Sequence, residues 1–474
     1  MRAAQTLGIA TLAAALTLPG CGARSAAVTL PPAPFSEGGY QPQSAMPVRH
    51  LILMVQENRT FNNLFATFPG AVGTTTGKEL VSQGGSYVER PIKLTETPLY
   101  SKIDLSHSYP GFLVAYQNGA MDGFDLVKYL RNQKTEGSYP YQYVNPKDIA
   151  PYWSIAAHWG LADEMFQTQG SDSFTAHQDL IRGGTFVDST QSLIDLPTSP
   201  YTWGCDAQPP SRTTLITTKL QYLRNKGPFP CSNKFPDYGS GGYKTLRDLL
   251  DAKKISWRYY APKFAKTQPN GMWNAFDLIA PVRYGPEWSA NISSPETNVL
   301  SDITHGKLAG MSWVIPDAQN SDHPAYGSTD TGPSWVASVV NAVGRSKYWN
   351  STVVIVVWDD WGGFYDSVAP PPQDDQGGPG FRIPMLVVSP YVKKGDGSRG
   401  GYISNTVYEF GSIVRFIEDT WDLGRLDTTD TTSTSIGDMF DFKQPPRKFV
   451  QIAAPHDAGY FLRQKPSGLP VDDE

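Results

Sequence analysis

A chain of 474 residues, 40% hydrophobic and 18% charged, has the composition of a globular protein and is long enough for one large α/β domain with insertions or for two domains. Its formal net charge of -5 argues against nucleic-acid binding, because it leaves no excess of basic residues to contact phosphates. Beyond the N-terminus no segment has 18 uncharged apolar residues in succession, so the mature chain is not expected to span a bilayer.

The first 47 residues have the organisation of an export signal followed by a tether. The apolar run over residues 7–18 is too short for a membrane-spanning helix, and it leads into the segment LPGC, which resembles a bacterial lipoprotein signal. We therefore expect a signal peptide over 1–20, lipidation of Cys21, and a Pro-, Ala- and Ser-rich tether over 21–47. The protein would then be exported and lipid-anchored, in the periplasm or at the cell surface; export without a lipid is the alternative.

Residues 48–55 (VRHLILMV) predict a buried strand, and Glu57 and Asn58 come directly after it. In open α/β sheets, ligands bind just beyond the carboxyl ends of the strands. A carboxylate and an amide at that place are ligands for a hard cation or hydrogen-bonding partners for a phosphate. By itself, a Glu-Asn pair is also common in loops.

Two further polar residues stand next to predicted helices. Residues 70–98 are expected to be irregular, and His107 then precedes a predicted helix over 111–118, where an imidazole either faces a cleft or forms structural hydrogen bonds. Ser173 lies in the segment GSDSFTAH, and a helix is expected from about Thr175. A serine just before a helix either caps the free N–H groups or acts as a nucleophile at the positive end of the helix.

The stretch 188–242 is rich in Pro, Gly and Ser and is too long for a simple connection, so we expect an insertion that covers or shapes a cleft. It contains Cys205 and Cys231, the two cysteines that remain besides Cys21. In an exported protein these two are expected to form a disulfide, and two free thiols are the alternative.

Strands and helices alternate through the rest of the chain, which indicates a doubly wound α/β sheet. After a helix over 149–159, the predicted elements are the helices 243–252, 335–345 and 407–419 and the strands 255–260, 311–315, 353–357 and 385–389. His323 follows the strand 311–315, in the segment SDHP. Residues 427–474 are polar with scattered prolines and are expected to form a tail on the surface of a main domain over 48–426.

The strand 353–357 (VVIVV) is apolar on both faces, which is typical of a central strand of a parallel sheet covered by helices on both sides. Asp359 and Asp360 follow it, and then Gly362 and Gly363. Adjacent carboxylates repel each other unless a cation lies beside them, and glycines allow the backbone to turn sharply and approach a ligand. We therefore predict a metal site; a helix N-cap or an Asx turn is the alternative.

These polar residues all lie at strand ends or helix starts, and in a parallel α/β sheet such positions gather at one edge. Carboxylates, an amide, a hydroxyl and two imidazoles together suit metal-assisted phosphoryl transfer. A cation would lower the pKa of the hydroxyl and balance the phosphate charge, and the histidines would protonate the leaving oxygen or hold the phosphate. The set consists of Glu57, Asn58, His107, Ser173, His323, Asp359 and Asp360.

Six segments follow one another along the chain: QENRTFNNLFATFPGA, HSYPGFLVAYQNGAMDGF, SFTAHQDLIRGGT, SDHP, WDDWGGFYDSVAPP and YEFGSIVRFIEDTWDL. Together they resemble the bacterial phosphoesterase family of phospholipases C and related acid phosphatases, in the alkaline-phosphatase-like superfamily. The resemblance implies a three-layer α/β/α fold with a mainly parallel central sheet and a loop-rich insertion. It also implies that 48–426 is the catalytic domain of a metal-dependent phosphoester hydrolase that acts through a serine phospho-enzyme.

The implied cofactor is a divalent metal ion, whose identity stays open among Ca²⁺, Mg²⁺, Mn²⁺ and Zn²⁺. By the resemblance, Asn58 contacts the phosphate. The implied metal ligands are Glu57, Asp359, Asp360 and Ser173.

Ser173 also matches the position of the family's nucleophile, with Ser171 as its local rival, because a small shift of the alignment would exchange the two. His107 and His323 match the histidines that flank the phosphate. His177 is expected to face the helix side as a structural residue.

Two departures from the family pattern bear on the substrate. Many members carry a histidine where Asn405 stands, and acid phosphatase members place histidines around Tyr259 and Tyr260, which argues against an acid phosphatase profile. We therefore expect a phospholipase C-like enzyme that acts on phosphodiesters such as phospholipid headgroups at a membrane. An acid phosphatase-type phosphomonoesterase and a non-catalytic, ligand-binding surface lipoprotein are the alternatives.

Overall fold

A computed structural model of the protein describes most of the chain beyond residue 45, namely residues 46–129, 132–198, 204–207, 211–228, 231, 243–263, 271–396 and 400–469. The predicted signal peptide, Cys21 and almost all of the predicted tether lie outside these residues. The chain divides into two units, and every element below belongs to the second unit, residues 38–474. No helix of the described residues is long and apolar enough to cross a membrane.

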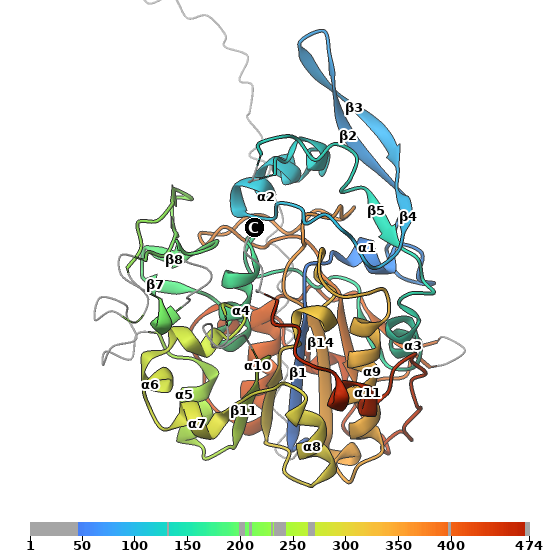
Figure 1. Ribbon diagram of the computed structural model, residues 1–474, viewed down its shortest axis with the longest axis vertical. Helices are drawn as coiled ribbons and strands as arrows, with labels where there is room; N and C mark the ends of the chain where they lie inside the picture. The colour runs from blue at the N-terminus through green and yellow to red at the C-terminus, as the bar shows by residue number, and fades with distance from the viewer. Residues whose placement is uncertain are drawn as a thin grey trace, which may run out of the picture. The chain divides into compact units, whose positions relative to one another are not determined.

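An eight-stranded sheet forms the centre of the second unit (Figure 1). All of its strands run parallel except β15, which is antiparallel to both of its neighbours. The order across the sheet is β12 (Ile292–Ser293), β11 (Trp257–Tyr260), β13 (Met311–Val314), β1 (His50–Gln56), β14 (Thr352–Trp358), β15 (Met385–Val388), β6 (Gly160–Ala162) and β16 (Tyr402–Ser404). Every residue of β14 is buried, as its unbroken apolar run predicted.

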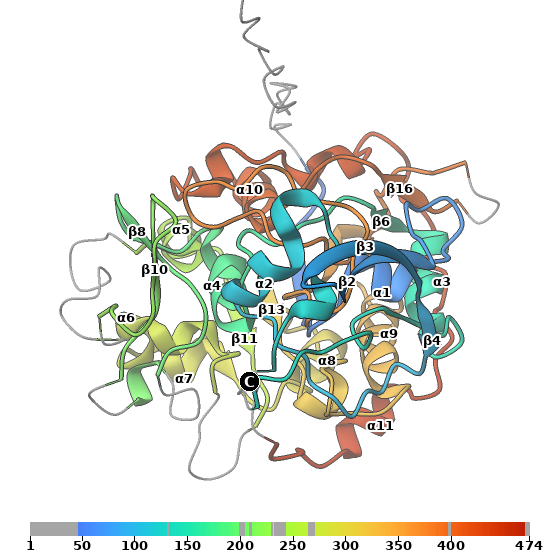
Figure 2. The same ribbon diagram turned by 90° about the horizontal axis from the view of Figure 1, so that it is seen from above.

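Helices cover both faces of this sheet, as Figures 1 and 2 show from two directions. One layer contains α4 (Ser173–Arg182), α5 (Leu246–Ala252) and α10 (Phe410–Trp421), which pack on one another. The other layer contains α3 (Ala150–His158), α8 (Asn298–Thr304), α9 (Thr331–Gly344) and α11 (Ala458–Arg463). The predicted α/β/α architecture is therefore confirmed. The other α-helices of the described residues are α1 (Phe61–Phe65), α2 (Tyr109–Tyr116), α6 (Ala280–Arg283) and α7 (Glu287–Asn291).

Local sequence signals explain where the helices of the first layer begin and end. α10 starts with a capping box, in which the backbone N–H of Glu409 donates to Ser412 Oγ at 3.0 Å and the Glu409 side chain accepts from the backbone of Ser412. α4 ends at Gly183, whose φ of 83° is in the left-handed region that glycine adopts without strain. These signals set the start of α10 and the end of α4.

The prediction of irregular structure over 70–98 is wrong. β2 (Thr76–Gln83) and β3 (Ser86–Lys93) form an antiparallel hairpin joined by Gly84 and Gly85, whose φ angles of 61° and 86° suit a tight two-residue turn. A short strand, β4 (Thr95–Thr97), then pairs with β5 (Gln142–Val144). The hairpin escaped prediction because its strands are mostly exposed and therefore lack the buried apolar run by which the other strands were found.

The predicted insertion contributes to a small antiparallel sheet beside the main one. The disulfide predicted between Cys205 and Cys231 is present, with the two Cα atoms 5.0 Å apart. The strands of this small sheet, in order, are β10 (Tyr222–Leu223), β9 (Leu215–Thr217), β8 (Gln191–Leu193) and β7 (Phe186–Asp188).

The described part of the predicted tail packs on α9. The ring of Phe461 lies 5.3 Å from that of Trp335, and the backbone N–H of Ile452 donates to Asn341 Oδ1 at 2.9 Å. Both Phe461 and Ile452 are buried, so this segment adds to the hydrophobic core.

We predict that removing the disulfide destabilises the protein. The two cysteines are 26 residues apart, and closing a loop of that length in the unfolded chain corresponds to about 3 kcal/mol on the chain-entropy estimate. The double variant Cys205→Ser/Cys231→Ser should therefore lose about 3 kcal/mol of unfolding free energy, measured by urea denaturation. Reduced wild-type protein is the control and should unfold together with the variant; a variant as stable as oxidised wild type would contradict the prediction.

Candidate active site

Two buried carboxylates, Glu57 and Asp359, lie side by side at the carboxyl edge of the sheet. They do so because β1 and β14 pair in parallel with Gln56 opposite Trp358, and Glu57 and Asp359 are the next residues of the two strands. The backbone N–H of Asp359 donates to the carbonyl of Gln56 at 2.9 Å, which extends the ladder by one step. The register of the central pair thus brings the two carboxylates together.

The Asp359 carboxylate is held by the backbone on one side only. Its Oδ1 accepts from the N–H of Asn58 at 2.9 Å and from the N–H of Asp360 at 2.7 Å. Its Oδ2 has no hydrogen-bond partner among the described residues and lies 3.8 Å from His177 Nε2. The fixed oxygen orients the group, and the other oxygen is directed at the neighbouring imidazole.

His177 completes a group of three with these carboxylates. Its Nε2 lies 3.2 Å from Glu57 Oε1, and one potential ligand atom from each of the three buried residues falls within 4.8 Å of the others. The expectation that His177 faces the helix side as a structural residue is therefore wrong. α4 begins at Ser173, two residues earlier than predicted, so Ser173 and His177 are one helical turn apart on the same face.

The group Glu57, His177 and Asp359 fits a divalent cation. Two carboxylates buried next to each other repel, and their burial is costly unless positive charge compensates them. The second oxygen of Asp359, buried without a hydrogen bond from the described residues, is available as a ligand atom. Two carboxylates and one imidazole form a donor set found around Zn²⁺ and other transition metals, whereas Ca²⁺ and Mg²⁺ prefer oxygen alone.

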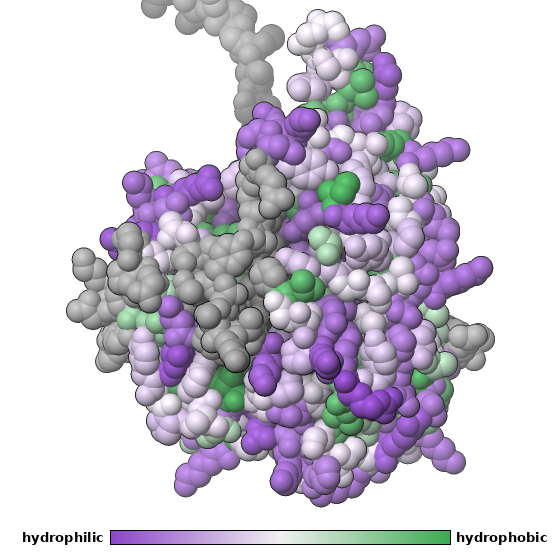
Figure 3. All heavy atoms as spheres, in the orientation of Figure 1, coloured by the Kyte–Doolittle hydropathy of each residue, from purple (hydrophilic) through white to green (hydrophobic). Residues whose placement is uncertain are grey.

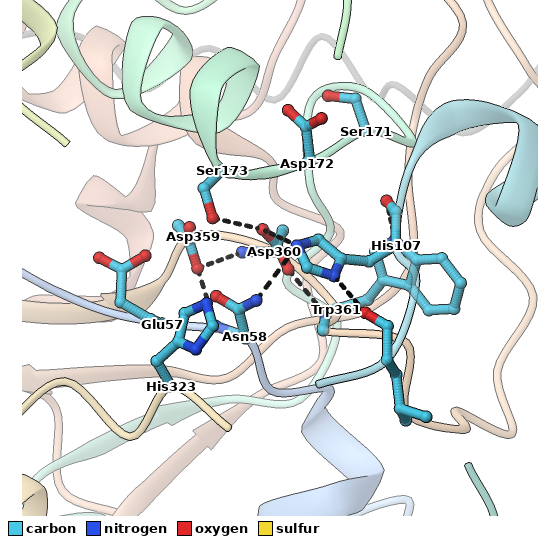
Figure 4. Close-up of polar contacts among 12 residues, drawn as sticks. Glu57, Asn58, His107, Ser171, Asp172, Ser173, His323, Asp359, Asp360 and Trp361 are labelled. Carbon is cyan, nitrogen blue, oxygen red and sulfur yellow. Dashed lines mark hydrogen bonds and ion pairs between the residues drawn. The ribbon is translucent and has the colours of Figure 1, made fainter. Parts of the chain in front are cut away.

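Ser173 is the first residue of α4, and its Oγ donates a hydrogen bond to Asp360 Oδ2 at 2.9 Å. Figure 4 shows the Ser173 side chain directed at the carboxylates, whereas Ser171 and Asp172 lie apart from them. The N-terminus of a helix stabilises negative charge at this position. Of the two candidate serines, Ser173 therefore has the geometry of a nucleophile.

His107 lies on the other side of Asp360. Its Nδ1 donates to the carbonyl of Leu105 at 2.7 Å, and its Nε2 lies 3.1 Å from Asn58 Nδ2. Nε2 also lies 3.6 Å from Asp360 Oδ2. The indole N–H of Trp361 donates to the backbone carbonyl of His107 at 3.0 Å, which ties the histidine to the turn after β14.

His323 belongs to the same cluster but faces it from the opposite side to His107, as Figure 4 shows. Its Nδ1 lies 2.5 Å from the carbonyl of Pro324. Its ring is 6.0 Å from that of Trp273, which in turn lies 6.3 Å from the ring of His177. Trp273 therefore packs against both imidazoles at this end of the site.

The residue before His323 has a strained backbone that a buried network holds. Asp322 has a φ of 72°, and Arg59 donates to its carbonyl from Nη2 at 2.8 Å and from Nε at 3.1 Å. Its carboxylate accepts from Tyr152 Oη at 2.7 Å and from Trp358 Nε1 at 3.2 Å. Burial raises the pKa of Asp322 to about 6, although Tyr152 and Arg59 oppose the rise. This network positions the turn that presents His323.

The two glycines after the aspartate pair are required by close packing. Gly362 and Gly363 have φ angles of 55° and 74°, and a Cβ on them would collide with the carbonyl of Asn58 and with the side chain of Leu105. Asn58 itself has a φ of 60°, which asparagine tolerates better than most residues. The predicted sharp turn is therefore present, and it brings the segments of Asn58 and His107 against Asp360.

The comparison with protein families agrees with this arrangement of residues. The model of the Phosphoesterase family matches residues 48–424. The chain belongs to the Phosphoesterase family. The family predicted from the six sequence segments is therefore confirmed.

Curated relatives of this phosphoesterase include phospholipases C. It is 24% identical over 451 residues to the non-hemolytic phospholipase C of Pseudomonas aeruginosa. That alignment covers 84% of this chain and 58% of the relative. It is also 24% identical over 448 residues to phospholipase C A of Mycobacterium tuberculosis. That alignment covers 84% of this chain and 78% of the relative. The chain thus spans little more than half the length of the Pseudomonas relative.

Among solved structures, a protein of the alkaline phosphatase superfamily from Vibrio parahaemolyticus aligns with 80% of this chain and 69% of its own. The identity is 10% and the TM-score 0.34, a similarity too weak to carry an argument.

The two departures from the family pattern lie in different places in this phosphoesterase. Asn405 is exposed and directly follows β16, at the far edge of the sheet from the central pair. Tyr259 and Tyr260 are buried; Tyr259 donates to the carbonyl of Trp273 at 2.5 Å, and Tyr260 donates to Asp302 Oδ2 at 2.8 Å. Tyr259 therefore supports the tryptophan that packs against the two site histidines.

We predict that Asp322 makes the stability of the phosphoesterase depend on pH. The pKa of Asp322 in the folded protein is about 6, above the usual 3.8, so the folded state binds the proton more tightly than the unfolded state does. This proton binding stabilises the folded protein at low pH, and the stabilisation is lost as the pH rises through 6. Asp322→Asn removes the titration. Between pH 4 and pH 7 the unfolding free energy of the variant relative to wild type should rise by up to about 3 kcal/mol.

Urea denaturation at a series of pH values measures this difference. Asp441→Asn, at an exposed position, is the matched control and should follow the wild-type profile. Parallel profiles of Asp322→Asn and wild type would rule out the assignment.

Proposed function

We propose that this phosphoesterase hydrolyses phosphodiesters of phospholipid headgroups as a phospholipase C, with Ser173 as nucleophile. The observation that carries the proposal is the 2.9 Å hydrogen bond from Ser173 Oγ to Asp360 Oδ2 at the first turn of α4, beside a buried group suited to a cation. The phospholipases C among its relatives support the substrate class. The disulfide supports export to an oxidising compartment, as the signal and Cys21 predict.

In the proposed reaction, Ser173 Oγ forms a bond to phosphorus and Asp360, which already accepts its hydrogen bond, takes the proton. The bond to the leaving alcohol breaks, and its oxygen takes a proton from His107 in the protonated form. Water then forms a bond to phosphorus and gives a proton to His107, which is now neutral. The bond from phosphorus to Ser173 Oγ breaks, the serine oxygen takes back the proton held by Asp360, and the phosphorylated headgroup is released. Asn58 and His323 contact the phosphoryl oxygens in this scheme, and the start of α4 stabilises their charge.

We assign Glu57, His177 and Asp359 to the divalent metal ion, because their ligand atoms lie within 4.8 Å of one another and all three are buried. Such an ion, when bound, supplies positive charge next to the phosphoryl oxygens. The imidazole favours Zn²⁺ or Mn²⁺ over Ca²⁺ and Mg²⁺ among the ions considered. We assign Asp360 to holding the hydroxyl of Ser173, since the two side chains bond to each other.

Ser173→Ala is predicted to lower kcat/KM for p-nitrophenyl phosphorylcholine by at least about 10³-fold, because it removes the hydroxyl that donates to Asp360 and that attacks phosphorus in the proposed reaction. Ser171→Ala is the matched control and should stay within about threefold of wild type, since its side chain lies apart from the carboxylates. Equal activity of Ser173→Ala and wild type would remove the serine from the mechanism. Faster turnover of p-nitrophenyl phosphate than of the diester would favour the phosphomonoesterase alternative.

His177→Asn and Asp359→Asn are each predicted to weaken metal binding by at least about tenfold, because each removes one of three ligands from a buried site. Elemental analysis and equilibrium dialysis with Zn²⁺ and Mn²⁺ measure the effect. His158→Asn is the control, since that imidazole bonds to the carbonyl of Ser154 away from the group. Unchanged metal content in His177→Asn would refute the assignment of this histidine.

A further inference from the structure

Exposed apolar side chains are concentrated in the segment that covers the carboxyl edge of the sheet. Within the described residues, eleven large apolar residues are exposed, and six of them fall between residues 72 and 113. These six are Val72, Tyr87, Val88, Tyr100, Ile103 and Leu113. Apolar residues exposed singly are ordinary, but six of eleven in one short segment favour a contact surface there.

This segment is attached to the carboxyl edge at both of its flanks. The backbone N–H of Val72 donates to Asp163, just after β6, at 2.9 Å from Oδ2. The carbonyl of Ser101 accepts from the N–H of Ala325, two residues after His323, at 2.7 Å. The exposed apolar residues are therefore on the same side of the molecule as the candidate active site.

The β2–β3 hairpin projects from this side, as Figure 1 shows, and Figure 3 shows apolar spheres on it. Its base is fixed: the N–H of Leu80 donates to Asp125 Oδ1 at 3.1 Å, and the carbonyl of Lys78 accepts from Tyr141 Oη at 2.6 Å. Its far end is solvent-exposed, and Tyr87 and Val88 are 61% and 41% exposed. The hairpin is thus a braced arm with apolar side chains at its tip.

The charge pattern of the hairpin distinguishes its tip from its sides. Residues 81–88 (VSQGGSYV) contain no charged side chain. Below them, the strands carry charges of both signs, and Lys78 forms an ion pair with Glu89 at 3.1 Å. Charged side chains and Pro91 along an open strand hinder the addition of another strand. An uncharged tip with a tyrosine and a valine instead suits the boundary between lipid headgroups and acyl chains.

We propose that the tip of the β2–β3 hairpin inserts into the surface of a zwitterionic phospholipid membrane and holds the carboxyl edge of the sheet towards its substrate. The inference rests on the proposed phospholipase C function for the identity of the surface. The tip has no basic side chain to attract it to anionic lipid, and the net charge of -5 opposes binding to an anionic surface, so zwitterionic lipid is the surface expected.

The test is a double variant, Tyr87→Ser/Val88→Ser, made in a Cys21→Ser background so that an N-terminal lipid does not mask the effect. Sedimentation with phosphatidylcholine vesicles should show at least about tenfold weaker binding than the parent, with a similar loss of activity on the vesicles. Activity on soluble p-nitrophenyl phosphorylcholine should be unchanged. The control Val450→Ser/Leu462→Ser removes two apolar side chains of similar exposure elsewhere, 41% and 56%, and should bind like the parent.

Undiminished binding of the double variant to phosphatidylcholine vesicles would overturn the proposal. So would binding to phosphatidylglycerol but not to phosphatidylcholine vesicles, or a parent dimer that the double variant dissociates in sedimentation velocity, which would identify a second copy of the chain as the partner. Absence of turnover of the soluble diester by the parent would instead contradict the proposed function, and vesicle binding would still decide the role of the hairpin.

Discussion

Two acidic side chains share one buried place in this protein because Gln56 of β1 lies opposite Trp358 of β14 in the central parallel pair. Glu57 and Asp359 extend from the two strand ends, and Asp359 is oriented by the backbone N–H groups of Asn58 and Asp360. A slip of one residue in this pairing would separate the carboxylates and exchange the side chains that pack against the two helix layers, so the close packing of the core enforces the register on which the site depends. In the proposed site, a cation held by the two carboxylates and His177 would offset the electrostatic cost of the pair.

A single helix start supplies the other half of the chemistry. Ser173 opens α4, and His177 follows one turn later on the same face, so one rigid element directs a hydroxyl at Asp360 and an imidazole at Glu57. This arrangement separates the two neighbouring aspartates, one towards the group of three and one towards the serine. Adjacent residues at a strand end point in different directions, so Asp359 faces Glu57 and His177 while Asp360 bonds to Ser173.

The segment over the carboxyl edge connects this buried site with the outside. It contributes His107, held between Leu105 and Asn58, and it carries the projecting hairpin at the same side. A fully buried set of polar residues requires that the substrate be delivered at this edge in a defined orientation. Under the proposed function, the apolar arm next to it is a physical means of taking a phosphodiester from a lipid surface.

The sequence by itself determined the fold class, the central strand 353–357 and the aspartates after it, since unbroken apolar runs and their ends are local properties. It also determined which serine and which two histidines to consider. Only the tertiary structure decided that His177 faces Glu57, because that depends on where α4 begins, and helix ends vary by a residue or two from any pattern. The exposed hairpin likewise left no apolar run to detect. Asp359 and Glu57, 302 positions apart, lie together because of the register between β1 and β14, and a register between two strands cannot be read from either segment alone.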